Sequence, residues 1–185
     1  MVRSSDKREK LITAAKRLIH RQGFYQTTLA DIAREADVPL GNVYYYFKTK
    51  DELAAAVIQE RSGQLLQRIE RWERDPDPKR RLLAFIDIPS DMNKSIAAHG
   101  CPIGSLCQEL DKCRTPLAKK ADDLLRRQLA WVTEQFRLLG KDNADTLGVS
   151  LMANVQGALL LANALNDASI VAQQIAQIKA WIAEQ

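Results

Sequence analysis

Apolar residues recur along this chain at intervals of three and four, the spacing that places them on one face of an α-helix. Within residues 7–22, for example, Leu11, Ala15 and Leu18 share a face, and the basic residues fall elsewhere. No stretch shows the alternation expected of a half-buried β-strand, and the three tyrosines at 44–46 are too few to form one. The pattern therefore predicts an all-α protein.

Breaks in this pattern divide the chain into about nine predicted helices. Proline disfavours helix at the residue before it, and glycine often occupies the position just past a helix end. The predicted helices span residues 7–22, 29–36, 40–47, 51–74, 79–88, 105–113, 116–139, 143–164 and 168–184. The stretch 89–103 holds two prolines and a glycine, and we expect it to be the least helical part of the chain.

Positive charge is concentrated near the N-terminus. The formal net charge is +4 at pH 7, and residues 1–50 hold ten Lys or Arg against five Asp or Glu. The rest of the chain holds 17 basic and 18 acidic residues. A basic segment joined to a near-neutral one indicates a polyanionic partner for the basic segment alone.

The two short predicted helices at 29–36 and 40–47 follow a basic helix and are joined by a tight turn. This is the pattern of a helix-turn-helix, whose second helix enters the major groove of DNA with its N-terminal residues toward the base edges. Val43 and Phe47 are predicted to point inward. The residues predicted to face DNA from this helix are Leu40, Gly41, Asn42, Tyr44 and Tyr45.

The chemistry of these positions suits DNA. Gly41 permits close approach of the backbone, the Asn42 amide can bond an adenine edge, and tyrosine offers both an apolar ring and a hydroxyl. Thr28 begins a helix whose free N–H groups attract anions, and with Asp31 it resembles a capping box. Lys48 and Lys50 follow the predicted helix at 40–47, where they can reach phosphates. The competing interpretations are core aromatics for the tyrosines, solvated charges for the lysines and a water-bonded amide for the asparagine.

Three runs in this region carry a family resemblance. They are TTLADIA at 27–33, VPLGNVYYYF at 38–47 and KDEL at 50–53, and Ala14, Leu18, Gly23 and Phe24 fit the same template. Together they resemble the N-terminal domain of the TetR family of repressors over residues 7–55. Beyond that segment the resemblance is architectural only. Tyr46 departs from the pattern, because this position is often histidine in the family.

The resemblance implies a three-helix DNA-binding domain at 1–50 and a helical effector-binding and dimerisation domain at 51–185. It also implies that the third helix reads bases, that Thr28, Tyr45 and Lys50 touch phosphates, and that the last two helices form a homodimer. The implied function is a ligand-responsive, sequence-specific transcriptional regulator that binds operator double-stranded DNA. A small, largely apolar effector would release this repressor from its operator.

The effector is expected in an apolar cavity of the second domain with few polar anchors. The lining residues suggested by the helix faces are Phe85, Ile88, Met92, Cys101, Ile103, Leu106, Trp131, Phe136 and Met152. An alternative is that Cys101 or Cys107 senses oxidants or electrophiles, since three cysteines lie between positions 101 and 113. The competing interpretation of Cys107 is a small buried hydrophobe.

A candidate subunit interface is also visible in the last two predicted helices. Small residues at 148, 153, 157, 158 and 162 lie among the larger residues Leu147, Leu151, Val155 and Leu159. The final helix has an apolar face of Ile175, Ile178, Trp181 and Ile182. Two such helices from each subunit would form a four-helix bundle. The alternative is that these faces close the core of one subunit.

Other functional classes receive less support from the sequence. No apolar run approaches the ~20 residues of a membrane span, and the N-terminus turns at once into a charged helix, so we expect a cytoplasmic protein. The sequence shows no nucleophile paired with a base, no cluster of metal ligands and no phosphate-binding glycine loop. It therefore predicts no enzyme, no cofactor and no metal site. A non-specific, architectural DNA binder would carry basic charge along the whole chain, and this one does not.

Overall fold

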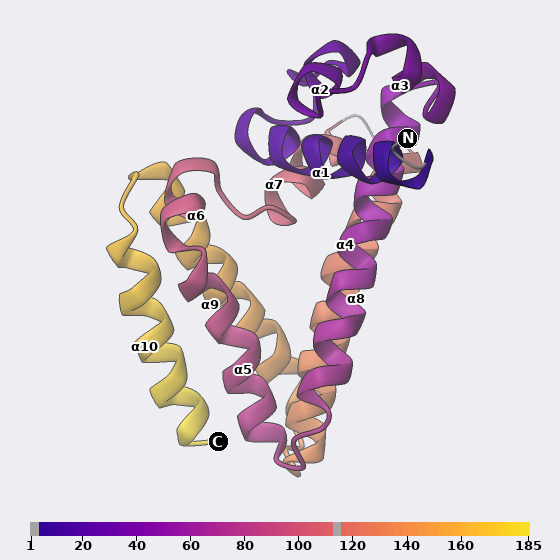
Figure 1. The fold of residues 1–185 in the computed structure, drawn as a ribbon. Helices are drawn as coiled ribbons and strands as arrows, with labels where there is room; N and C mark the ends of the chain where they lie inside the picture. The colour runs from indigo at the N-terminus through magenta and orange to yellow at the C-terminus, as the bar shows by residue number, and fades with distance from the viewer. Residues whose placement is uncertain (1–3, 113–115) are drawn as a thin grey trace. The chain divides into compact units, whose positions relative to one another are not determined.

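The computed structural model describes residues 4–112 and 116–185, and helices account for most of them (Figure 1). The ten α-helices of this described part are α1 (Ser4–Gln22), α2 (Leu29–Glu35), α3 (Leu40–Tyr46), α4 (Lys50–Trp72), α5 (Pro78–Asp91), α6 (Asn93–His99), α7 (Gly104–Asp111), α8 (Pro116–Leu138), α9 (Ala144–Ala164) and α10 (Ser169–Ala183). The all-α prediction is confirmed, with ten helices in place of about nine. Cys113 lies outside the described residues.

The additional helix comes from the stretch 89–103. Here α5 continues through a buried Pro89, and α6 follows after a break at Met92. Ile96 of α6 is fully buried in the core of its unit. The prediction that this stretch is the least helical part was wrong, because burial of an apolar face stabilises a helix more than intrinsic propensity does.

The chain forms two compact units. The first takes in the described residues of 1–63 and 105–124, and the second takes in residues 64–104 and 125–185. Helices α4 and α8 each contribute residues to both units. This packing division differs from the predicted boundary at residue 50, which concerns function and stays a prediction.

In the first unit, α1 packs on α2 and α2 packs on α3. Val43 and Phe47 are buried, as their spacing predicts. The turn after α2 is a Schellman motif, in which the Val38 N–H donates to the Ala33 carbonyl at 3.0 Å and Asp37 adopts a φ of 52°. This turn ends α2 and sets the direction in which the chain enters α3.

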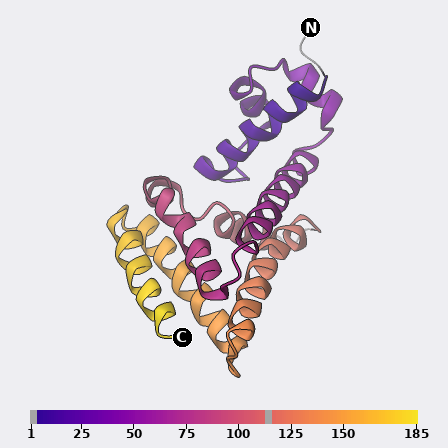
Figure 2. The same ribbon diagram turned by 60° about the horizontal axis from the view of Figure 1, so that its bottom comes forward.

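In the second unit, α10 packs against α9 and α5, and α6 packs against α9 (Figures 1 and 2). Phe136 of α8, Leu82 of α5 and Leu151 of α9 are fully buried in the core of this unit. At Gly148, an added Cβ would lie 2.2 Å from Thr133 Oγ1, so α8 and α9 approach each other closely at this glycine. Glycine is therefore required there by packing and not by backbone conformation.

The corner between α4 and α5 is held by one guanidinium group. Arg81 donates to the carbonyl oxygens of Asp75 and Glu73 at 2.7 and 3.4 Å and to Gln135 Oε1 at 3.2 Å. Gln135 is almost fully buried, and its Nε2 donates to the Trp131 carbonyl at 3.1 Å. Both polar ends of this buried amide therefore have partners, as burial of a polar group requires.

Many residues predicted for a subunit interface lie inside the second unit instead. The buried members of that set are Gly148, Leu151, Val155, Ala158, Leu159, Ala162, Ile175, Ile178 and Ile182. For these residues the alternative holds, since their faces close the core of one subunit. The exposed apolar side chains of α9 and its C-cap residue form a different set, which we call the α9 outer stripe: Val149, Ala153, Leu160, Leu161, Ala164 and the C-cap Leu165.

Helix α9 is long and apolar enough to cross a membrane by length and composition alone. Its apolar residues are interrupted by polar ones, so no continuous apolar run of that length is present in the sequence. One face of α9 belongs to the core of the second unit, and core helices commonly meet the same criterion. The composition of α9 is therefore weak support for a membrane span.

Candidate DNA-binding surface

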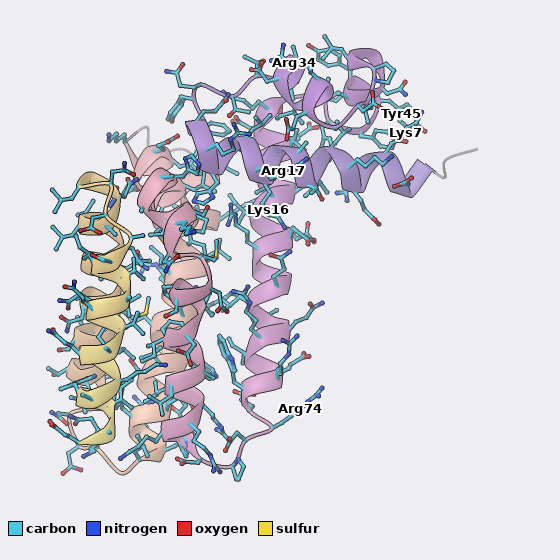
Figure 3. The ribbon with its side chains drawn as sticks, turned by 60° about the vertical axis from the view of Figure 1, so that its left-hand side comes forward. Lys7, Lys16, Arg17, Arg34, Tyr45 and Arg74 are labelled. Carbon is cyan, nitrogen blue, oxygen red and sulfur yellow. The ribbon has the colours of Figure 1, made fainter. Side chains whose placement is uncertain are left out.

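Helix α3 presents large aromatic side chains to solvent. Tyr44 is 48% exposed and Tyr45 is 73% exposed, so the interpretation of these two residues as core aromatics is wrong. Figure 3 shows Tyr45 projecting from the α3 region. Tyr46 is half-buried, and its ring meets the Tyr45 ring edge-on with centroids 5.0 Å apart. Leu40 and Gly41 are exposed and Asn42 is half-buried, so the five predicted residues lie at or near the surface.

The first unit also carries basic side chains on α1, on α2 and just after α3. Lys7, Lys16 and Arg17 lie along α1, and Arg34 lies on α2 (Figure 3). Lys48 is exposed, and its Nζ donates to the Tyr44 carbonyl at 2.8 Å. Ion pairs join two of these arginines to acidic residues of α2, but exposed pairs of this kind contribute little and can exchange partners.

Thr28 forms the predicted capping box with Asp31. The Thr28 hydroxyl donates to Asp31 Oδ2 at 2.6 Å, and the Asp31 N–H donates back to Thr28 Oγ1 at 3.1 Å. The Thr28 hydroxyl and N–H bonds, with a smaller contribution from Arg34, hold the pKa of the Asp31 carboxyl below its usual value. Because the hydroxyl proton is already donated, the predicted phosphate contact of Thr28 requires this bond to open.

Lys50, at the start of α4, faces back toward the turn after α1. Its Nζ donates to the carbonyl oxygens of Phe24 and Tyr25 at 3.0 and 3.2 Å and lies 4.4 Å from the centroid of the Phe24 ring. An ammonium group has three N–H donors, so one remains for a phosphate. The structure thus gives Lys50 a role in holding this turn that the sequence did not indicate.

The chain resembles known proteins in sequence. A sequence profile described as "Bacterial regulatory proteins, tetR family" matches residues 11–57. An uncharacterized HTH-type transcriptional regulator in the lacX 3' region of Lactococcus lactis is 32% identical over 89% of this chain and 87% of its own length. The chain belongs to the TetR family.

Two further comparisons agree with this membership. The HTH-type transcriptional regulator LmrA of Bacillus subtilis is 29% identical to this TetR-family chain over 84% of the chain and 86% of its own length. A TetR-family transcriptional regulator from Agrobacterium tumefaciens has the same fold, with a TM-score of 0.84 over 96% of this chain and 98% of that structure, at 21% identity. The chain is accordingly a helix-turn-helix transcriptional regulator, and these relatives are named as regulators and not as enzymes.

The predicted effector-pocket residues of this TetR-family chain fall into three groups. Phe85, Trp131, Phe136 and Met152 are buried in the core of the second unit, and Met92 and Cys101 are half-buried against that core. Ile88 and Ile103 are half-buried members of the same unit. Leu106 is buried in the first unit.

Two neighbours of this group were not predicted from the sequence: Trp72, the last residue of α4, and Glu73, which follows it. The rings of Trp72, Phe85 and Trp131 form a cluster with centroids 5.1 to 6.0 Å apart. Trp131 Nε1 donates to Glu73 Oε1 at 3.1 Å. The aromatic composition of residue 72 was visible in the sequence, but nothing local indicated which helices it would join.

The two described cysteines differ in environment. Cys101 is half-buried, and its Sγ accepts a hydrogen bond from the Gly104 N–H at 3.3 Å. Cys107 is buried, which agrees with its interpretation as a small hydrophobe. Within residues 4–112 and 116–185, no group of three or more His, Cys, Asp or Glu side chains is arranged to hold a metal ion.

Proposed function

We propose that this TetR-family chain is a sequence-specific repressor that reads operator DNA with α3. The observation that carries the proposal is the exposure of Tyr44 and Tyr45 beside Asn42, on the part of the chain that holds all of its excess positive charge. Phosphate contacts from basic residues supply affinity, and contacts to base edges supply specificity. The protein would act in the cytoplasm, where its operator lies.

The regulator is proposed to act as a homodimer through α9 and α10. In the α9 outer stripe, residues 149, 153, 160 and 164 share one face of the helix, and none of these apolar side chains is covered within the subunit. On α10, the exposed alanines at 172, 176, 180 and 183 also share one face. A second copy of this chain would bury both faces in a four-helix bundle.

The effector is proposed to be small and largely apolar, and to bind in the second unit near Phe85, Trp131 and Met152. These side chains are apolar and buried, and half-buried Met92 and Cys101 lie at the edge of the same core. Two DNA-reading heads must reach successive major grooves about 34–36 Å apart. An effector that favours a different spacing of the heads would release the operator.

Operator binding is tested with DNA from upstream of the chain's own gene against a scrambled duplex of equal composition. Fluorescence anisotropy at about 0.15 M salt should give a much lower Kd for the native sequence. A titration of salt would separate phosphate contacts from base contacts, since only the former release counterions. Equal affinity for the two duplexes at the same salt would overturn sequence-specific regulation.

Effector binding is tested with palmitate and with a polyaromatic dye as two apolar probes. Trp72 and Trp131 lie in the aromatic cluster of the second unit, so binding nearby should change intrinsic tryptophan fluorescence. The same probe should weaken the anisotropy signal of the operator complex, whereas glucose, as a polar control, should not. A probe that binds without changing operator affinity would contradict the proposed release mechanism.

A second candidate is regulation by oxidants or electrophiles at Cys101. The observation that favours it is the hydrogen bond from the first residue of α7 to the Cys101 sulfur, because modification of the thiol would break this bond. Release of operator by hydrogen peroxide in wild type but not in Cys101→Ser would support it. An identical response in both proteins would exclude this thiol as the sensor.

A further inference from the structure

The turn between α1 and α2, residues 23–28, is held from two sides by charged side chains of distant elements. The Phe24 N–H donates to Glu109 Oε2 of α7 at 2.6 Å. The Phe24 and Tyr25 carbonyls accept hydrogen bonds from Lys50 Nζ of α4. Both polar groups of the Phe24 backbone are therefore bonded to ionised side chains, and such bonds are stronger than those between neutral groups.

Gly23 makes room for the carboxylate. Its φ is +86°, a conformation that favours glycine, and an added Cβ would lie 2.4 Å from Glu109 Oε1. The Gly23 carbonyl also accepts a bond from the fully buried Thr27 hydroxyl at 2.7 Å. The same glycine thus ends α1 and admits Glu109 to the backbone of the turn.

Glu109 reaches this turn from a part of the chain 85 residues away. It is half-buried on α7, and its helix neighbours Leu106, Cys107 and Leu110 are buried in the first unit. Helix α7 starts at Gly104, the last residue of this segment assigned to the second unit. The chain therefore passes from the second unit directly into the helix that holds the turn.

Residues 23–28 also fix the start of the helix-turn-helix. The Thr27 N–H donates to the Phe24 carbonyl at 3.2 Å, and the next residue, Thr28, caps α2. Helix α2 packs on α3, which carries the predicted base-reading residues. Since the connection from Phe24 to α2 is short and internally hydrogen-bonded, a change in the orientation of Phe24 must move α2 and α3 with it.

We propose that Glu109 is a positioning residue for operator recognition, and that it transmits the position of α7 to α3. The proposal rests on the proposed function, because operator binding is the activity that it modulates. Without the carboxylate, the Phe24 N–H loses its partner and the turn samples several orientations. Operator affinity then falls although no side chain predicted to face DNA has changed.

The first test compares Glu109→Ala with Glu109→Gln and with Gln108→Ala, a matched control at an exposed neighbouring position of α7. Against DNA from upstream of the chain's own gene, Glu109→Ala should bind about tenfold more weakly than wild type, the effect of one lost bond to a charged group. Glu109→Gln should restore affinity to within about threefold, because its amide oxygen still accepts. Wild-type affinity in Glu109→Ala, or no rescue by Glu109→Gln, would overturn the proposal.

The second test uses no DNA, so its result is independent of whether the operator has been identified. Amide NMR spectra of isotopically labelled wild type and the same variants report the Phe24 N–H directly. In Glu109→Ala this resonance should move upfield and exchange faster with solvent, and resonances of α2 and α3 should shift as well. Changes confined to α7 and Phe24 would overturn the proposed positioning role. Failure of the wild-type protein to distinguish its promoter from scrambled DNA would instead overturn the proposed function.

Discussion

The outer faces of α3 and α9 both expose large apolar side chains, but their chemistry differs. Tyr44 and Tyr45 carry hydroxyl groups and lie beside a half-buried Asn42. The α9 outer stripe is purely aliphatic. A tyrosine can remain hydrated at one edge while its ring contacts a polar partner, whereas an aliphatic stripe gains free energy only when it leaves water. The first surface therefore suits reversible contact with DNA, and the second suits lasting contact with another subunit.

The largest expected effect comes from placing charge in the α9 outer stripe. Val149→Glu combined with Leu160→Glu should give a monomer, because an unpaired carboxylate is costly to bury. Loss of the two-headed arrangement should weaken operator binding by more than about 100-fold. Analytical ultracentrifugation and anisotropy measure the two effects. Leu138→Glu, at a position of α8 that is 55% exposed, is the control and should stay dimeric. If the Val149→Glu/Leu160→Glu protein is also dimeric, the proposed difference in role between the surfaces of α3 and α9 is wrong.

Alanine substitutions at two glycines of α9 test which face of the helix is buried in the subunit and which is exposed. Gly148→Ala should lower the free energy of unfolding by about 1–3 kcal/mol, because its Cβ would lie 2.2 Å from Thr133 Oγ1 and 3.2 Å from Thr133 Cα. At Gly157 a Cβ meets nothing within 4 Å, so in the Val149→Glu/Leu160→Glu background alanine should stabilise the helix by up to about 1 kcal/mol. Urea denaturation of each variant checks both values. Equal effects at the two positions would contradict the assignment of faces.

On the α3 side, Tyr45→Ala should weaken operator binding about tenfold without changing the oligomeric state. Tyr45→Phe should lose less, because it keeps the apolar ring and removes only the hydroxyl. Anisotropy with native and scrambled DNA separates loss of specificity from loss of affinity. A Tyr45→Ala protein that binds its promoter as tightly as wild type would show that the exposed ring has another purpose.

The smallest effect is expected at the start of α2. Thr28→Val should lower the free energy of unfolding by about 1 kcal/mol at neutral pH by removing the cap. The pKa of Asp31 is lowered in the folded protein, so its contribution is present above the ordinary aspartate pKa and is lost as the pH falls through the folded pKa. The deficit of the variant should therefore shrink in acid. Denaturation at a series of pH values from neutral to acidic measures this, and a constant deficit would contradict it.

Much of the first unit was predictable because its signals are local. Pro39 and the Val43–Phe47 spacing place α3 correctly, and the spacing of Thr28 and Asp31 predicts a cap that the structure contains. The family resemblance added the expected base-reading face. Tyr44 and Tyr45 were correctly placed at the surface, because a helix that points Val43 and Phe47 inward turns these two residues outward.

The second unit was less predictable because its decisive contacts are tertiary. On α9, apolar residues cover almost the whole circumference, so the pattern could not say which face a subunit buries in its own core. Ile96 shows the same difficulty for α6, since only burial revealed why a helix forms near Pro89. The Phe24–Glu109 bond joins residues far apart in sequence, and a glutamate on a short helix carries no mark of such a partner.

The guanidinium group of Arg81 has a mechanical consequence for the whole of α4. It bonds the residues just after α4 to α5 and α8, so we expect that end of α4 to be held in place and not to act as a free hinge. A rod that is held at one end bends along its length when a sideways force acts on it. Spin labels spaced along α4 should therefore report a gradual change in curvature during regulation, with the least displacement beside Arg81.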